Sequence, residues 1–358
     1  MLRSMRREWE MSFAEGADAA LNMLKSAPFD VVVTDMRMPG KDGAQLLQEV
    51  MELYPHMVRL ILSGHSDQEM AMRSVGPAHQ YLSKPCDSEA LKQTISQACR
   101  LRDTLAEENL RQLVSRLKGL PSLPSLYLKL VDEIQKPNVT TAHIGEIIAQ
   151  DIGMTAKILQ LVNSAFFGLS RRVTNPEDAV GFIGLERIKA MVLSIHVFSE
   201  FNASTEAGFP AEQFWSHSLA VGKLADQIAK SVQNASSSET FTAGMLHDVG
   251  TLVLASNLPE QYQAARDLMK SENLTTTEAE RRVFKATHSE IGAYLLGLWG
   301  LPSSLIEAVA FHNNPSQCLS QGFTTLSAIH IADGLLHRHS TAPFGEGTKL
   351  DEEYIAKL

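Results

Sequence analysis

The hydrophobic pattern of this 358-residue chain changes character once, near residue 105, and the change limits the folds that the chain can adopt. Before that point short apolar runs alternate with amphipathic stretches, whereas after residue 126 apolar residues recur almost everywhere at helical spacing. Alternating strands and helices are typical of a parallel sheet with helical crossovers, and a continuous helical pattern indicates an all-α domain. The sequence therefore predicts two domains of different fold class.

The first hundred residues contain the apolar runs expected of buried strands. FDVVVT at 29–34 and MVRLIL at 57–62 are continuous apolar segments, as in a parallel sheet that is covered on both faces. Between them, the spacing of apolar residues over 42–55 predicts an amphipathic helix that ends at Pro55. The expected strands are 9–14, 29–34, 57–62 and 79–83, and the expected helices are 17–26, 42–55, 68–76 and 88–105.

Three polar side chains follow successive strands of this predicted sheet. Asp35 follows the first apolar strand, Ser63 the second and Lys84 the third. Because ligands bind beyond the carboxyl ends of parallel strands, a carboxylate, a hydroxyl and an ammonium are expected to meet at one rim. The carboxylate can act as a nucleophile, and the hydroxyl and the ammonium can bind phosphoryl oxygens. Together the three groups can form and hold an aspartyl phosphate.

The segments TDMRMPGKDG, ILSGHSD and YLSKPCD at these strand ends resemble the receiver domain of two-component response regulators. The resemblance covers 1–105 and implies a flavodoxin-like α/β fold, a histidine kinase as partner and Mg²⁺ as cofactor. It marks the bond between Lys84 and Pro85 as a candidate cis peptide. It assigns the phosphoacceptor to Asp35, the switch hydroxyl to Ser63, the switch aromatic to Tyr81 and the family's lysine to Lys84.

The start of the chain departs from the receiver pattern. Receivers begin with a strand that ends in an acidic pair for Mg²⁺, but no such strand or pair precedes Asp35 here. A single carboxylate is a poor site for an ion that takes several oxygen ligands in octahedral geometry. Two explanations stay open. We expect a misassigned start with the missing strand encoded upstream, because the rest of the domain is intact, and the alternative is a degenerate receiver that serves in docking or dimerisation.

Residues 106–122 are predicted to connect the two domains. Leucines at helical spacing continue from Leu91 to Leu117 with one slip near 105–110, and the turn-rich GLPSLPS follows at 119–125. The pattern fits a last receiver helix followed by the first helix of the next domain. It also fits one signalling helix that pairs in a homodimer, although the repeat is shorter than a typical coiled coil.

The second domain, 123–338, is predicted to be all-α, and a polar tail at 339–358 follows it. Capping residues such as Thr140, Asn175 and Thr275 mark several helix starts. The expected helices are 126–135, 141–150, 154–164, 176–183, 185–201, 212–232, 239–254, 259–271, 275–284, 288–297, 303–311 and 322–337.

Six imidazole and carboxylate side chains recur on successive helices of this domain. Such groups suit Fe, Mn or Zn, although each one alone is more often a hydrogen-bonded core residue than a ligand. The order His, His-Asp, His, His, Asp is more specific, and it resembles the HD superfamily of metal-dependent phosphohydrolases. The candidate metal ligands are His217, His247, Asp248, His288, His312 and Asp333.

Three long segments narrow this resemblance. LPSLPSLYLKLVDEI, IGEIIAQDIGMTAKILQLVNSAFFG and PEDAVGFIGLERIKAMVL are similar, in order, to the HDOD domain, an HD-related output domain that is taken to be regulatory. The lysine of the hydrolases' HD-x-G-K segment is Thr251 here, and Asn313 stands where cyclic-dinucleotide phosphodiesterases have a second histidine. These differences argue against hydrolysis of cyclic dinucleotides and leave metal binding open.

Composition limits the partners and the compartment. The net charge of −9 argues against a protein that binds nucleic acid through bulk positive charge. Three unpatterned cysteines, no apolar run long enough for a membrane and no signal-peptide core predict a cytoplasmic protein. The sequence thus predicts a response regulator in which phosphorylation at Asp35 controls an HDOD domain that contacts a downstream signalling protein. The alternatives are a receiver-gated metal-dependent phosphohydrolase and a non-phosphorylated scaffold.

Overall fold

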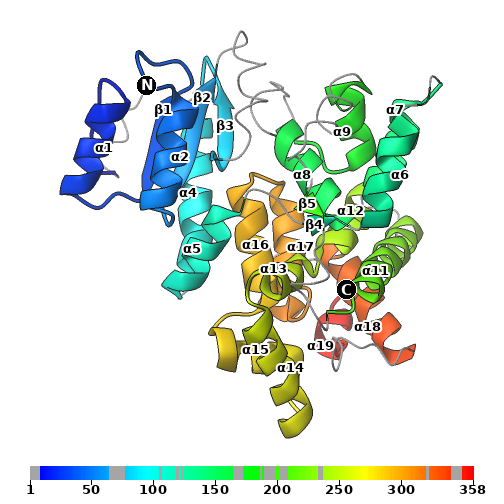
Figure 1. The fold of residues 1–358 in the computed structure, drawn as a ribbon. Coiled ribbons are helices and arrows are strands. Elements are labelled where there is room, and N and C mark those ends of the chain that lie inside the picture. The colour runs from blue at the N-terminus through cyan, green and yellow to red at the C-terminus, as the bar shows by residue number, and fades with distance from the viewer. Residues whose placement is uncertain are drawn as a thin grey trace.

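The structure of the chain is a computed structural model, and it contains an α/β domain followed by a helical domain (Figure 1). No described helix is long and apolar enough to cross a membrane. The residues that the structure describes are 9–63, 77–86, 88–104, 107–117, 121–122, 124–134, 136, 138–163, 172–185, 188, 199–200, 209–232, 237–319, 322–339 and 349–358.

Among the described residues, the α/β domain contains a three-stranded parallel sheet, which three of the four predicted strands form. The strands lie in the order β1-β2-β3, with Asp35 opposite Leu62 and Ser63 opposite Ser83 in the pairing register. Asp42 begins the second helix with a capping box, accepting from Gln45 N while the Gln45 side chain accepts from Asp42 N. The elements are α1 (Ala17–Ser26), β1 (Val31–Asp35), α2 (Gly43–Leu53), β2 (Val58–Ser63) and β3 (Gln80–Ser83).

The strand predicted over 9–14 is wrong. These residues have no regular secondary structure, and Phe13 is 56% exposed. The alternation of Trp9, Met11 and Phe13 suits a strand, but a strand needs a neighbour with which to form a ladder. In the described part of the chain β1 pairs with β2 alone. No described strand therefore lies between β1 and residues 9–14, and these residues have no ladder partner. The helix predicted over 68–76 lies outside the described residues.

The described residues after the receiver sheet form helices and their connections, apart from one short pairing of β4 (Pro121–Ser122) with β5 (Ser199–Glu200). Several helices begin with a side-chain cap, as at Thr140, Asn175, Thr275 and Thr287. The helices are α4 (Ser88–Thr104), α5 (Glu108–Arg116), α6 (Pro124–Ile134), α7 (Thr141–Ile148), α8 (Ile152–Asn163), α9 (Pro176–Ile183), α11 (Ala211–Ser231), α12 (Ser237–Leu246), α13 (Val249–Asn257), α14 (Pro259–Glu272), α15 (Thr276–Phe284), α16 (His288–Leu298), α17 (Ser303–Phe311), α18 (Thr325–His339) and α19 (Glu352–Ile355), with a 3₁₀ turn η4 (Pro315–Gln317).

Two predicted helices differ from the structure. The helix expected over 239–254 is two helices, α12 and α13, which are interrupted at His247 and Asp248. The helix expected over 185–201 does not extend to its predicted end, because 199–200 pair with 121–122 as β5. The second difference arises from a contact with a distant part of the chain, which local periodicity does not contain.

The connector is not one long helix. α4 ends at Thr104 and α5 begins at Glu108, so the slip in the leucine pattern marks a real interruption. Both helices pack against α16 of the helical domain (Figure 1). The two domains are therefore joined by packing as well as by the chain.

Polar contacts strengthen this packing at two points. The Gln80 side chain on β3 donates from Nε2 to the carbonyl oxygen of Gly297 at 3.1 Å. The hydroxyl groups of Ser115 on α5 and Tyr294 on α16 lie 3.3 Å apart, and Tyr294 is fully buried. α16 thus receives contacts from both the receiver sheet and the connector.

A buried guanidinium ties the sheet to the connector. Arg59 on β2 is 1% exposed and donates to backbone carbonyls of Pro55, Met57 and Pro77, and also to that of Ser115. Its Nη2 lies 2.8 Å from Nε2 of His79. Burial lowers the pKa of Arg59 to about 10, and burial together with Arg59 lowers the pKa of His79 well below its usual value. His79 is therefore neutral beside a cation that is stabilised mainly by carbonyl groups.

Arg59→Ala should strongly destabilise the protein. Four carbonyl groups would lose their donor in a buried place, so we expect the free energy of unfolding to fall by about 3 kcal/mol or more. Arg282→Ala is the matched control, since Arg282 is 52% exposed and should change the value by only about 0.5 kcal/mol. Urea denaturation of both variants tests this, and equal stability of the two would contradict it.

Candidate functional site

Two groups of chemically active residues occur in the structure, one in each domain. The first lies at the carboxyl rim of the receiver sheet. Asp35 ends β1 and Ser63 ends β2, and the pairing continues to the rim because Met36 N donates to Leu62 O at 2.9 Å. Lys84 follows β3, and its Nζ lies 2.6 Å from Asp35 Oδ1. The rim therefore has the carboxylate and ammonium in contact and the hydroxyl on the adjacent strand.

Close packing beside Asp35 fixes where α2 begins. A Cβ atom at Gly43 would lie 2.2 Å from the carbonyl oxygen of Asp35, so only glycine fits there. Gly43 N also donates to Met36 O at 2.9 Å. The motif TDMRMPGKDG thus folds back on itself and holds the first turn of α2 next to the rim.

The remaining predicted rim features have mixed outcomes. The peptide bond between Lys84 and Pro85 is cis, which confirms the sequence prediction. Tyr81 lies in β3 opposite Ile61, but its side chain is outside the described part of the structure. Ser63 is 3% exposed.

The described residues of the rim do not have the ligands that Mg²⁺ needs. Among the described residues, Asp35 belongs to no cluster of three metal-ligating side chains, and its carboxylate is already paired with Lys84. Mg²⁺ takes oxygen ligands in octahedral geometry, and a single carboxylate that is paired with an ammonium is a poor site for it.

The second group lies in the helical domain, where the structure brings all six predicted ligands together. The break between α12 and α13 presents His247 and Asp248, and the other side chains come from helices around it. His217 comes from α11, His288 begins α16, His312 follows α17 and Asp333 belongs to α18.

A glycine makes this convergence sterically allowed. Gly250 follows the His-Asp pair, and a Cβ atom there would lie 1.9 Å from the carbonyl oxygen of His288. Its absence lets the first turn of α13 approach the first turn of α16 directly. Asp248 Oδ1 then lies 3.3 Å from His288 Nε2 and 3.4 Å from His312 Nε2.

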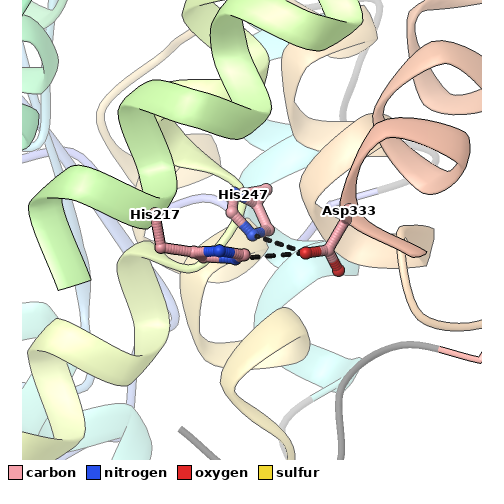
Figure 2. Close-up of side chains that lie close together, drawn as sticks. All are labelled: His217, His247 and Asp333. Atoms are coloured by element: carbon pink, nitrogen blue, oxygen red, sulfur yellow. Dashed lines mark ion pairs between the residues drawn. The ribbon is translucent and has the colours of Figure 1, made fainter. Parts of the chain in front are cut away.

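Two sets of three ligands result, and they share His247. In the first set, Nε2 of His217 and Nε2 of His247 lie 3.1 and 3.8 Å from Asp333 Oδ1, and Figure 2 shows both imidazoles directed at that carboxylate. In the second set, His247 Nε2 lies 3.4 Å from Asp248 Oδ2, and His312 completes the three. Within each set the ligand atoms lie within 4.8 Å of one another.

The chemistry of the first set fits a metal ion. The atoms His217 Nε2, His247 Nε2 and Asp333 Oδ1 are buried and make no hydrogen bond of acceptable geometry with any described residue, despite their short separations. Leaving such polar atoms buried and unsatisfied is costly. A divalent cation placed between them would satisfy all three, and two imidazoles with a carboxylate suit Fe, Mn or Zn.

The electrostatics of the site are those of alternating carboxylates and imidazoles. Burial alone would raise the pKa of Asp248, but His247, His288 and His312 hold it well below its usual value. Burial alone would also raise the pKa of Asp333, but His217 and His337 hold it well below its usual value. Burial lowers the pKa of His247 to about 4 despite its acidic neighbours. Both carboxylates are thus ionised and His247 is neutral, as metal ligands must be.

Sequence reasoning missed two residues that orient the ligands. Glu280 on α15 is buried and accepts from His288 Nδ1 at 2.7 Å, which leaves Nε2 facing the site. Burial alone would lower the pKa of His288, but Glu280 and Asp248 raise it well above its usual value. His337 on α18 lies one turn after Asp333, with Nδ1 3.0 Å from Asp333 Oδ1. The i, i+4 spacing from Asp333 is a signal that could have identified His337.

Asn313 also contacts the ligands. Its Nδ2 lies 2.8 Å from His312 Nε2 and 3.0 Å from His288 Nε2. The position that carries a second histidine in related phosphodiesterases therefore places an amide against both imidazoles. The site opens into a cavity of about 580 Å³, where Thr251 contributes a hydroxyl group in place of the hydrolases' lysine.

Comparisons with known proteins agree with this architecture. The HDOD domain matches residues 120–315, and the response regulator receiver domain matches 1–96. The chain belongs to the HDOD domain family, and it is a response regulator with a receiver domain before the HDOD domain.

Individual relatives cover only parts of the chain. The crystal structure of the MmoQ response regulator from Methylococcus capsulatus is 27% identical, covers 63% of this chain and 89% of that one, and has a TM-score of 0.53. An uncharacterised protein of Treponema pallidum is 28% identical over 56% of this chain and 39% of its own length. The hydrogenase transcriptional regulatory protein HoxA of Cupriavidus necator is 36% identical over 27% of this chain and 20% of its own. The chain thus spans well under half the length of these two curated relatives.

His337 should make the stability of the metal-free protein depend on pH. Burial alone would lower its pKa, but Asp333 raises the value to about 8, above the usual value near 6.5. A raised folded-state pKa stabilises the protein fully below about pH 6.5, and the contribution disappears as the pH rises through about 8.

Chelator-treated protein should therefore lose about 2 kcal/mol of unfolding free energy between pH 6 and 9 through His337 alone. His337→Gln removes this part of the loss, so the wild type should fall more steeply than the variant. Urea denaturation across this range measures the difference, and parallel curves would disprove the assignment.

Proposed function

We propose that this response regulator receives a phosphoryl group at Asp35 and transmits the signal to its HDOD domain, which then changes its contact with a downstream protein. The observation that carries the proposal is the position of α16. One end of this helix contributes His288 to the helical-domain site, and its further turns contact the connector through Tyr294 and the receiver through Gly297. Movement of the receiver against α16 therefore reaches the site through one rigid element.

The chemistry at the rim supports Asp35 as the acceptor. Its carboxylate is exposed enough to react, with a side-chain exposure of 46%, and a histidine kinase would be the donor. Lys84 Nζ, 2.6 Å away, would bind an oxygen of the transferred group, and the Ser63 hydroxyl on the next strand would bind another. Attack by the carboxylate oxygen on phosphorus forms the acyl phosphate and releases the donor.

The connector gives the route out of the receiver. Lys84 N donates to Ser63 O at 2.8 Å, so the rim is continuous with β2 and β3, and α4 follows β3 directly. α4 and α5 both pack on α16, and Arg59 bonds the receiver strands to the Ser115 carbonyl of α5. A shift at the rim would therefore bias the α4–α5–α16 contact, which we propose as the two-state element of the switch.

Asp35→Asn tests the phosphoacceptor. Incubation of the full-length protein with a small-molecule phosphodonor should add one phosphoryl mass to the wild type and none to the variant, because an amide is not the nucleophile that a carboxylate is. Asp30→Asn is the matched control and should be labelled like the wild type. Asp30 is an exposed residue just before β1, at the opposite end of the strand from Asp35. Intact mass spectrometry gives the answer. Failure of the wild type to be labelled would favour the non-phosphorylated scaffold.

We further propose that the helical-domain site binds a divalent metal, which leaves a receiver-gated phosphohydrolase as the second candidate function. The three unsatisfied buried atoms of His217, His247 and Asp333 support metal binding specifically. When bound, a metal would polarise a phosphoryl oxygen and lower the pKa of a coordinated water. Glu280 would hold His288 with its Nε2 toward the ligands, and Thr251 would offer a hydroxyl but no cation.

Metal analysis separates the two candidates. The purified wild type should contain a transition metal, and His247→Ala and Asp248→Ala should remove it because both residues join ligand sets around the break between α12 and α13. His143→Ala is a matched control, since this histidine is 44% exposed and far along the chain on α7. Elemental analysis measures the content, and a metal-free wild type would eliminate the hydrolase while leaving the regulatory proposal intact.

A further inference from the structure

The C-terminal segment of the chain, residues 349–358, is docked on the helical domain. The Tyr354 hydroxyl lies 2.6 Å from Ser327 Oγ on α18, and Tyr354 is buried. Asp351 accepts from Ser316 Oγ at 2.5 Å through one carboxylate oxygen and from Tyr354 N at 2.9 Å through the other. The segment lies beyond residues 120–315, so the HDOD family match does not include it.

A histidine links this tail to one of the candidate ligands. Asp351 N donates to Nε2 of His330 at 2.8 Å, so Nδ1 of the same neutral ring carries its proton. Nδ1 lies 2.7 Å from the carbonyl oxygen of His312. His330 is buried, and it therefore fixes the distance between the tail and the backbone of His312.

The tail also forms one wall of the cavity over the His/Asp cluster. Lys349, Leu350 and Asp351 line the same cavity of about 580 Å³ as Asp248 and Asp333. A volume of this size is typical of a small-molecule site. The cavity therefore has the metal-ligand cluster at one side and a segment from outside the family domain at another.

The charges that line the cavity are unequally satisfied. Glu278 accepts from Thr275 in a capping box, and Asp351 accepts from Ser316 and Tyr354. Lys349, in contrast, has no carboxylate within ion-pair distance among the described residues, and Arg266 of α14 lines the cavity as well. Glu278 and Asp351 are thus occupied by protein donors, and Lys349, which interacts electrostatically with Glu278 without an ion pair, borders the space and suits an anionic ligand.

We propose that the tail completes a binding site for a phosphate-bearing small molecule, with Lys349 as the residue that binds the phosphate. Thr251 lines the same cavity but has no charge, so Lys349 of the tail adds a cation to those that Arg266 and Arg281 already contribute to the lining. This assignment builds on the proposed metal site, because a metal at the cluster would face the same phosphate. It makes 349–358 a specificity-determining part of the domain.

Phosphate binding by the full-length protein tests the assignment. Calorimetric titration with inorganic phosphate should show binding to the wild type, and Lys349→Ala should weaken it about tenfold through loss of a charge-assisted hydrogen bond. Lys349→Arg should restore most of the affinity. Lys357→Ala is the matched control, because Lys357 is an exposed lysine of the same tail that does not line the cavity.

A second variant tests the docking rather than the charge. Tyr354→Phe removes the hydroxyl contact with Ser327 and leaves Lys349 in place, so phosphate affinity should fall several-fold without loss of bound metal. Metal content, measured on every sample, reports the metal proposal separately from phosphate affinity. No phosphate binding by the wild type, or equal affinity of Lys349→Ala and Lys357→Ala, would overturn the role of the tail.

Discussion

The close approach of α13 to α16 is the contact on which the rest of the helical domain depends. Gly250 lies against the backbone of His288, and no side chain fits between the two helices at that point. This contact holds His288 next to Asp248, which belongs to the second ligand set. Because α16 continues from there to the receiver, one helix determines both the geometry of the site and the position of the domain interface.

Much of the fold follows from patterns that are local in sequence. Asp35, Ser63 and Lys84 could be placed at one rim because parallel strands end at the same edge of a sheet. The candidate ligands of the helical domain could be expected to lie together because their order, and the adjacent His247 and Asp248, are typical of one kind of site. In both cases the chemistry of the residues and their spacing carried the information.

The features that the sequence did not reveal all depend on distant contacts. The strand expected over 9–14 needs a neighbouring strand, and the break at His247 is followed by the turn in which Gly250 packs against α16. Glu280 is an ordinary helix residue until the fold brings it to His288. The tail was expected only to be polar, yet Asp351 and Tyr354 form bonds to residues that periodicity could not connect with them.

The hydrophobic core also crosses the boundary between the two domains. Val58, Leu60 and Leu82 of the receiver strands belong to the same buried cluster as Leu295 and Leu298 of the helical domain. Either domain expressed alone would expose apolar surface that the other now covers, and exposed patches of this kind promote aggregation. The two domains should therefore lose their structure in a coupled way, so that a sequence change in one alters the thermal tolerance of the other.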